Sequence, residues 1–324
     1  KEIFISLVLM FLLVLPLTVT NYFYHDKKKG KNDSHSLPRS LQKQWTAPDT
    51  SKIPHTEQGD LIRKGRELVI HTSVFFGPHG SVASISNGMN CENCHMDGGT
   101  KPWANNFSSV GSIYPVFKSR RGQIETIEMR INDCFERSLN GSPIPDSGQE
   151  MKAMIAYIRW VGKDVNKGVK TKESGTENLP FLGRPADPDK GKIIYKASCE
   201  TCHGKNGEGK LLPNGKEYLY PPLWGRHSYN TGAGIFRISK FAGYIKNNMP
   251  FGVSKANPKL SNEDAWDVAA YVNSKPRPVK YFKMDWPEIS SKPFDYPFVP
   301  YADSVSVTRH KYGPFEALQS NKSR

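Results

Sequence analysis

The sequence predicts a mainly α-helical protein that consists of two small domains in tandem and an irregular C-terminal tail. Three observations lead to this prediction. The chain has 324 residues, which is roughly twice the length of a common single domain. The same order of features occurs twice: a helical segment, a Cys-x-x-Cys-His motif, a long loop region and a helical segment with aromatic residues. A polar stretch separates the two copies.

The chain begins with an uncharged apolar run, residues 3–20, that is just long enough to span a bilayer. Tyrosines follow it where an interfacial belt would lie. Because no small-x-small cleavage site follows, we expect residues 1–24 to form a membrane anchor, with a removed signal segment as the alternative. Residues 25–54 are polar and aperiodic, which indicates a flexible tether.

The two predicted domains span residues 55–165 and 181–275, and residues 166–180 form the linker between them. In the first domain we expect a helix over 60–75 and a capping box at 147–150 that begins the last helix. In the second we expect a helix over 188–197 and a capping box at 261–264. The tail, residues 276–324, is rich in Pro, Tyr and Phe and is expected to drape over the body as irregular structure.

The two Cys-x-x-Cys-His motifs indicate covalent haem attachment, because they supply two thiols for the haem vinyl groups and an adjacent imidazole for the iron. The sequence therefore predicts two class I-like cytochrome c domains with two covalently bound haem c groups, outside the cytoplasm in the periplasm. Zinc sites or redox-active dithiols are disfavoured, since no further cysteine pairs occur. The attachment cysteines are Cys91, Cys94, Cys199 and Cys202, and the proximal ligands are His95 and His203.

The second iron ligand is expected to differ between the domains. In the second domain Met249 precedes a proline and is the only methionine in residues 181–275, which favours it as the distal ligand over a role in core packing. In the first domain Cys134 is the one cysteine that no haem motif uses, so it has no disulfide partner and is favoured as the distal ligand. The competing candidates there are Met129, Met96, His71 and His79.

The segment around Cys134 predicts an anion site on a helix. Arg130, Cys134 and Ser138 are four residues apart and lie beside an apolar stripe that can cover the haem, formed by Ile124, Ile127, Ile131 and Phe135. Guanidinium groups favour a thiolate and bind oxyanions such as sulfonates. The alternative is that Arg130 and Arg137 bind haem propionates or are solvated.

The chain carries a formal net charge of +14, which favours anionic substrates or a partner with an acidic surface. Binding of nucleic acid is disfavoured, because no compact basic stripe with interleaved aromatic residues occurs.

The sequence resembles the thiosulfate dehydrogenase (tetrathionate synthase) family of dihaem cytochromes. The resemblance rests on the two haem motifs, on Met-Pro-Phe-Gly at 249–252 and on the pattern Arg-x9-Arg-Ile-Asn-x-Cys-x-x-Arg-Ser-x-Asn-Gly at 120–141. It implies that Cys134 ligates the active-site haem, that Arg120 and Arg130 bind the sulfonate ends of the substrate and that Ser138 lines the pocket. Some relatives have a redox-exchanging lysine where this chain has Asn248.

The resemblance implies an oxidoreductase that couples two thiosulfates to tetrathionate. Electrons would pass from the first haem to the second and then to a cytochrome or a membrane quinol-linked complex. We hypothesise that Cys134 forms a transient adduct with thiosulfate, which a second thiosulfate resolves. The alternatives are the same site run as a tetrathionate reductase, a non-catalytic electron-transfer cytochrome, a dihaem peroxidase, and an enzyme that conjugates sulfur to a partner protein.

Overall fold

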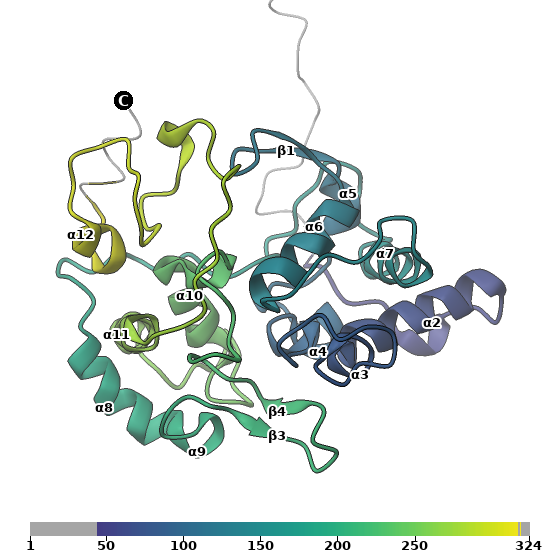
Figure 1. Ribbon diagram of the computed structural model, residues 1–324, viewed down its shortest axis with the longest axis horizontal. Coiled ribbons are helices and arrows are strands. Elements are labelled where there is room, and N and C mark those ends of the chain that lie inside the picture. The colour runs from purple at the N-terminus through teal and green to yellow at the C-terminus, as the bar shows by residue number, and fades with distance from the viewer. Residues whose placement is uncertain (1–43, 317, 319–324) are drawn as a thin grey trace, which may run out of the picture. The chain divides into compact units, whose positions relative to one another are not determined.

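The computed structural model describes residues 44–316 and 318, so the predicted anchor and most of the tether lie outside the described part. Among the described residues no helix has both the length and the apolar character needed to cross a membrane. The described chain is mainly helical, and its two haem motifs lie in separate helical halves (Figure 1).

The first half contains helices, two short strands and a π-helical turn, labelled η3. In chain order these are η1 (Thr50–Lys52), α2 (Glu57–Ile70), α3 (Thr72–Phe76), η2 (Cys91–Asn93), α4 (Met96–Gly99), α5 (Val110–Ile113), β1 (Val116–Lys118), β2 (Gln123–Glu125), α6 (Ile127–Asp133), η3 (Cys134–Ser138) and α7 (Gln149–Val161). The strands β1 and β2 form an antiparallel hairpin.

The second half repeats this arrangement and continues into the tail. Its elements are α8 (Pro188–Ser198), α9 (Glu200–His203), β3 (Lys210–Leu211), β4 (Tyr218–Tyr220), η4 (Gly234–Phe236), α10 (Ile238–Asn248) and α11 (Asn262–Ser274). The strands β3 and β4 form a second antiparallel hairpin. The tail adds η5 (Ile289–Ser291) and α12 (Val307–Tyr312).

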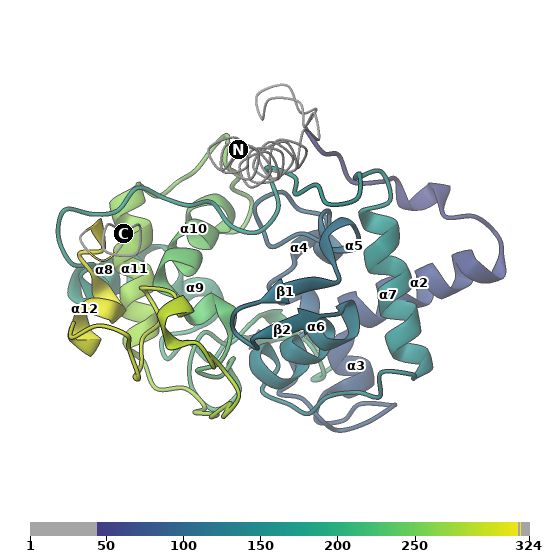
Figure 2. The same cartoon turned by 90° about the horizontal axis from the view of Figure 1, so that it is seen from above.

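Each half is held together by one pair of helices, α2 with α7 and α8 with α11 (Figure 2). Both crossings depend on a glycine. A Cβ on Gly65 would lie 1.9 Å from the carbonyl oxygen of Ala153, and a Cβ on Gly191 would lie 1.9 Å from that of Asp267. The backbones can approach this closely because glycine has no side chain. The two halves therefore share the same mode of helix packing.

The sequence predicted this framework, with errors in detail. The segment expected as one helix at 60–75 is helical but is divided at His71 into α2 and α3. The helix expected at 188–197 is present, and Ser261 forms the predicted capping box with Asp264. The capping box predicted at 147–150 is wrong, since Gly148 is the N-cap of α7 and supplies no side chain. Ile124 is not on the helical stripe, because it belongs to β2 and its side chain is 59% exposed.

The C-terminal tail does not only cover the surface, because its side chains complete the core of the second half. Phe294 and Phe315 pack against Phe181, and Phe315 also packs against Trp266, with ring centroids 5.4–5.9 Å apart. The tail is mostly irregular, as expected, but Phe294, Tyr312 and Phe315 pack in the same cluster as residues of α11. Burial of this apolar area stabilises the second half.

Replacement of Gly191 by alanine tests the helix crossing. We expect Gly191→Ala to destabilise the protein by about 1–3 kcal/mol, because α8 and α11 must move apart. Thermal unfolding of the haem-loaded protein measures this effect. Gly183→Ala is the matched control, since nothing lies within 4 Å of a Cβ at that position. Equal midpoints for the two variants would contradict the role of Gly191.

Candidate functional site

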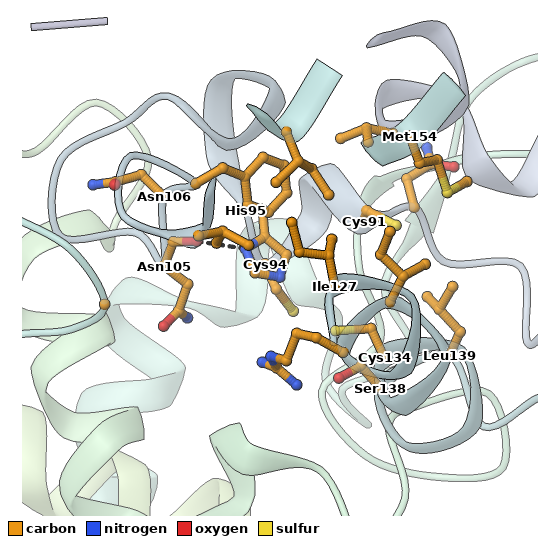
Figure 3. Close-up of a pocket in the computed structure, with 18 of the residues that line it drawn as sticks. Cys91, Cys94, His95, Asn105, Asn106, Ile127, Cys134, Ser138, Leu139 and Met154 are labelled. Atoms are coloured by element: carbon orange, nitrogen blue, oxygen red, sulfur yellow. Dashed lines mark hydrogen bonds between the residues drawn. The ribbon is translucent and has the colours of Figure 1, made fainter. Parts of the chain in front are cut away.

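The first cavity brings together the first haem motif and the Cys134 segment. Cys91, Cys94 and His95 line it from the region of η2, and Cys134 lines it from the start of η3. Figure 3 shows Cys134 projecting into the space beside Cys94 and His95. The walls are completed by apolar side chains of α6 and α7, which include Ile127, Ile131, Met154 and Ile158.

His95 is prepared for metal binding by its surroundings. Its Nδ1 lies 2.5 Å from the carbonyl oxygen of Asn105, drawn as a dashed line in Figure 3. This carbonyl accepts the Nδ1 proton, so Nε2 is left as the ligand atom. Burial lowers the pKa of His95 to about 4. The imidazole is therefore neutral at physiological pH, as a ligand to iron must be.

The helix that carries Cys134 changes register at this residue. α6 ends at Asp133 and continues as the π-helical turn η3, closed by the Leu139 amide, which donates to the Cys134 carbonyl at 2.9 Å. Such π turns occur frequently at functional sites. The four-residue spacing predicted from the sequence still places Arg130, Cys134 and Ser138 in one cavity. Phe135 does not face the cavity and packs edge-on against Phe76, with ring centroids 5.2 Å apart.

The arginines of this segment fall into two groups. Arg121 and Arg137 both pair with the buried carboxylate of Asp133. Arg130 lines the cavity and forms no ion pair with any carboxylate of the described residues. Cys134 lines the same cavity and, by its charge, raises the pKa of Arg130 above its ordinary value. Arg130 is therefore the guanidinium of this cavity that is available to an anion.

Arg120 is placed differently from Arg130. It is not among the residues that line the cavity of Cys134. Its side chain lies between the C-terminal tail and Gly232, and its Nη1 donates to the Gly232 carbonyl at 3.5 Å. The structure thus brings Arg130, Cys134 and Ser138 together and sets Arg120 in a neighbouring environment.

The competing ligands named from the sequence do not line the first cavity. His71 lies 2.7 Å from Glu217, and Met96 lines the second cavity. Two other methionines, Met89 and Met154, do line the first cavity. Both are almost fully buried in the core of the first half, a position that their spacing to His95 does not reveal.

The second cavity contains the second haem motif and Met249. It is lined by Cys199, Cys202 and His203, and the Nδ1 of His203 lies 2.9 Å from the carbonyl oxygen of Pro221. The lining continues to residues of the first half, Cys94 and Met96 among them. The second cavity therefore reaches the first haem motif, which suits electron transfer between the two sites.

Two orphaned polar atoms in the second half also suit a haem. The hydroxyl of Tyr229 and the Nε of Arg277 are buried and have no hydrogen bond of ordinary geometry among the residues described, although the two side chains lie beside each other. Tyr229 lines the second cavity, and the Arg277 guanidinium lies 4.4 Å from the centre of its ring. Buried donors require acceptors. A carboxylate of a haem propionate would satisfy both, so the residues present fit the group that the motif implies.

Comparison with known proteins agrees with this geometry. Residues 81–166 match the family model described as "SoxA/TsdA, cytochrome c domain", and residues 186–272 match "Cytochrome C oxidase, cbb3-type, subunit III". A thiosulfate dehydrogenase of Psychrobacter arcticus is 38% identical over 74% of this chain and 71% of its own. One of Allochromatium vinosum is 39% identical over 72% and 84%. The chain belongs to the thiosulfate dehydrogenase family.

A solved structure supports this membership. The thiosulfate dehydrogenase TsdBA of Marichromatium purpuratum, in its as-isolated form, has a TM-score of 0.67 and 30% identity over 75% of this chain. The chain spans about half of that protein, 52% of its length. As a member of the thiosulfate dehydrogenase family with two cytochrome c domains, the protein is an oxidoreductase with two covalently bound haem c groups.

In this thiosulfate dehydrogenase family member, Asn248 is fixed by hydrogen bonds. Its side-chain amide donates to the carbonyl oxygens of Tyr244 at 2.9 Å and Trp103 at 3.1 Å, and the residue is fully buried. It connects the end of α10 to the first half. The adjacent Met249 is left to line the second cavity.

Replacement of Met249 tests the predicted ligand of the second haem. We expect Met249→Ala to lower the reduction potential of that haem by on the order of 0.1 V, because axial ligands set the potential over a range of roughly 0.8 V. A spectroscopic redox titration measures the change. Met284→Ala is the control, since this methionine is 77% exposed. An unaltered potential and spectrum in Met249→Ala would rule out the assignment.

Proposed function

We propose that the protein oxidises thiosulfate by coupling two molecules to tetrathionate in the periplasm. The observation that carries this proposal is that Cys134 and Arg130, an arginine without an ion pair to any described carboxylate, line the same cavity as His95. The names of the relatives support the substrate. A cytochrome that only transfers electrons requires neither a cysteine nor an unpaired guanidinium at this place.

Arg130 and Ser138 have separate roles in the binding of thiosulfate. Arg130 binds the sulfonate end of thiosulfate and offsets its charge in a cavity with mainly apolar walls, where such a contact is stronger than in water. This holds the outer sulfur of thiosulfate toward Cys134. The hydroxyl of Ser138, one π turn further along, lies in the same cavity and offers a hydrogen bond to the anion.

Sulfur–sulfur bond formation proceeds on Cys134 in two steps. In the first, the Cys134 thiolate and one thiosulfate lose two electrons and form a cysteine S-thiosulfonate. In the second, the outer sulfur of another thiosulfate attacks the sulfane sulfur that is bonded to the Cys134 sulfur. The bond to Cys134 breaks, so tetrathionate is released and the thiolate is restored. No proton is released or taken up when the Cys134 sulfur and the thiosulfate sulfur both react as anions. The bound haems supply the acceptor for the two electrons and the path by which they leave.

Electrons leave through the second half. Its cavity contains residues of both haem motifs, Cys94 and Cys202 among them, so the two cofactor sites adjoin. An external electron acceptor, such as a cytochrome or a membrane quinol-linked complex, takes them from there. Haem attachment outside the cytoplasm supports a periplasmic location, and the apolar run at 3–20 supports attachment to the membrane.

Removal of the Cys134 sulfur tests the reaction. We expect Cys134→Gly, with both haems retained, to lose turnover of thiosulfate with ferricyanide as the acceptor, since no sulfur remains to carry the adduct. The haem content is checked by the spectrum of the denatured protein. Wild-type rates in the variant would eliminate the mechanism. A wild type that turns over only tetrathionate with a reductant would reverse the direction.

Replacement of Arg130 tests the anion contact separately. We expect Arg130→Gln to lower kcat/KM for thiosulfate by on the order of 10²-fold, the usual effect of removing one preorganised charge. Arg159→Gln is the matched control, because Arg159 is exposed on α7 and does not line the cavity. Equal losses in the two variants would indicate a general effect of net charge.

A further inference from the structure

One short loop joins the first haem motif to the end of α10. The Asn105 carbonyl accepts from the Nδ1 of His95 at 2.5 Å, the contact drawn as a dashed line in Figure 3. Two positions earlier in the loop, the Trp103 carbonyl accepts from the side-chain amide of Asn248 at 3.1 Å. Asn248 directly precedes Met249. The loop therefore contacts the expected proximal ligand of the first haem and the neighbour of the expected distal ligand of the second.

The middle residue of this loop packs against the same end of α10. Ala104 is fully buried in a small apolar cluster with Met96 and Tyr244. Met249 packs against this cluster. The Tyr244 hydroxyl also donates to the Asn93 carbonyl of the first haem motif, at 3.4 Å. The hydrogen bonds of the loop are thus accompanied by packing between residues that adjoin the two haem motifs.

The backbone of the loop is held in an unusual conformation. Trp103 has a φ of 64° and Asn105 a φ of 53°, both in the left-handed region. Asparagine tolerates this region, but a bulky side chain is strained there and remains only where its surroundings enforce it. The Trp103 amide donates to the Glu173 carbonyl at 2.9 Å, and the Asn105 amide donates to that of Gly175 at 3.0 Å. Because both loop carbonyls are aimed by this enforced backbone, a shift of one changes the direction of the other.

The hydrogen bonds of Asn248 do not satisfy the whole side chain. The residue is fully buried, and its Nδ2 donates to the carbonyls of Tyr244 and Trp103, but its Oδ1 accepts no hydrogen bond among residues 44–316. A buried acceptor without a donor destabilises the folded state. A leucine, which has the same branched shape, would avoid this orphaned oxygen but could not bind the two carbonyls. The advantage of an amide at this position therefore lies in the contacts of its Nδ2.

We infer that Asn248 is a positioning residue that couples the two haem sites. It acts directly on the adjacent Met249, and through the loop it acts on His95. A proximal histidine whose Nδ1 proton is held by a carbonyl donates more strongly to iron, which stabilises the oxidised state. Movement of the Asn105 carbonyl away from His95 would therefore raise the potential of the first haem. The inference depends on the two iron ligands and not on thiosulfate as the substrate, so it can fail or hold independently of the proposed function.

Replacement of Asn248 by leucine tests the coupling. We expect Asn248→Leu to raise the reduction potential of the first haem and to lower that of the second, because Met249 is held less firmly. A spectroscopic redox titration of the haem-loaded protein measures both potentials, and the different distal ligands expected for the two haems distinguish their spectra.

Asn273→Leu is the matched control. Asn273 is a buried asparagine of α11 whose Nδ2 donates to the Phe236 carbonyl at 3.0 Å and whose Oδ1 also lacks a donor among the described residues. It is not among the residues that line either cavity. We expect neither potential to shift in this variant. A shift confined to the second haem in Asn248→Leu would show that Asn248 only orders the end of α10, and would overturn the inference.

A second pair of variants tests the loop from its other end and does not depend on the folding of Asn248→Leu. Asn105→Val disfavours the left-handed backbone, whereas Asn105→Gly permits it. We expect Asn105→Val to shift the potentials of both haems, and Asn105→Gly to shift them less. If either potential is unaltered in Asn105→Val, or if the two variants have equal effects, the loop does not couple the two sites.

Discussion

Three parts of the chain meet at the buried guanidinium of Arg137. It pairs with Asp133 on the preceding helical turn and, through two hydrogen bonds, with Asp285 of the tail. The ring of Phe282 lies 3.7 Å from the guanidinium, and the Arg137 carbonyl accepts from the Asn230 amide. An arginine that is 3% exposed must be paired, because an unpaired buried charge is strongly destabilising. This pairing fixes the turn that carries Cys134 and brings the tail to Arg120.

The ion pairs with Asp133 distinguish the arginines that stabilise the structure from those that can bind an anion. Asp133 takes up Arg121 and Arg137, so the basic segment holds its own shape without a ligand. Arg130 and Arg120 remain without a carboxylate among residues 44–316, one in the cavity of Cys134 and the other beneath the tail. Net charge alone does not reveal this division, since all four arginines count equally toward the total of +14.

The sequence allowed prediction of features that depend on local spacing. Haem attachment, the helix pairs and the shared face of Arg130, Cys134 and Ser138 follow from motif and periodicity, and the structure agrees. The sequence did not predict the two hairpins, α10 or the π turn. Short strands and a single change of helical register leave only weak periodic patterns in the sequence. The contacts of Trp286 and Tyr296 with Arg120 could not be predicted, since an irregular tail has no period and these contacts join residues more than 150 positions apart.

The proposed reaction explains why an arginine without an ion pair lies in the cavity of Cys134. Two thiosulfates carry two negative charges each, so their approach to about 4 Å costs about four times the roughly 1 kcal/mol of a single pair in water, and more in a drier site. One arginine beside Cys134 offsets the charge of the molecule that forms the adduct.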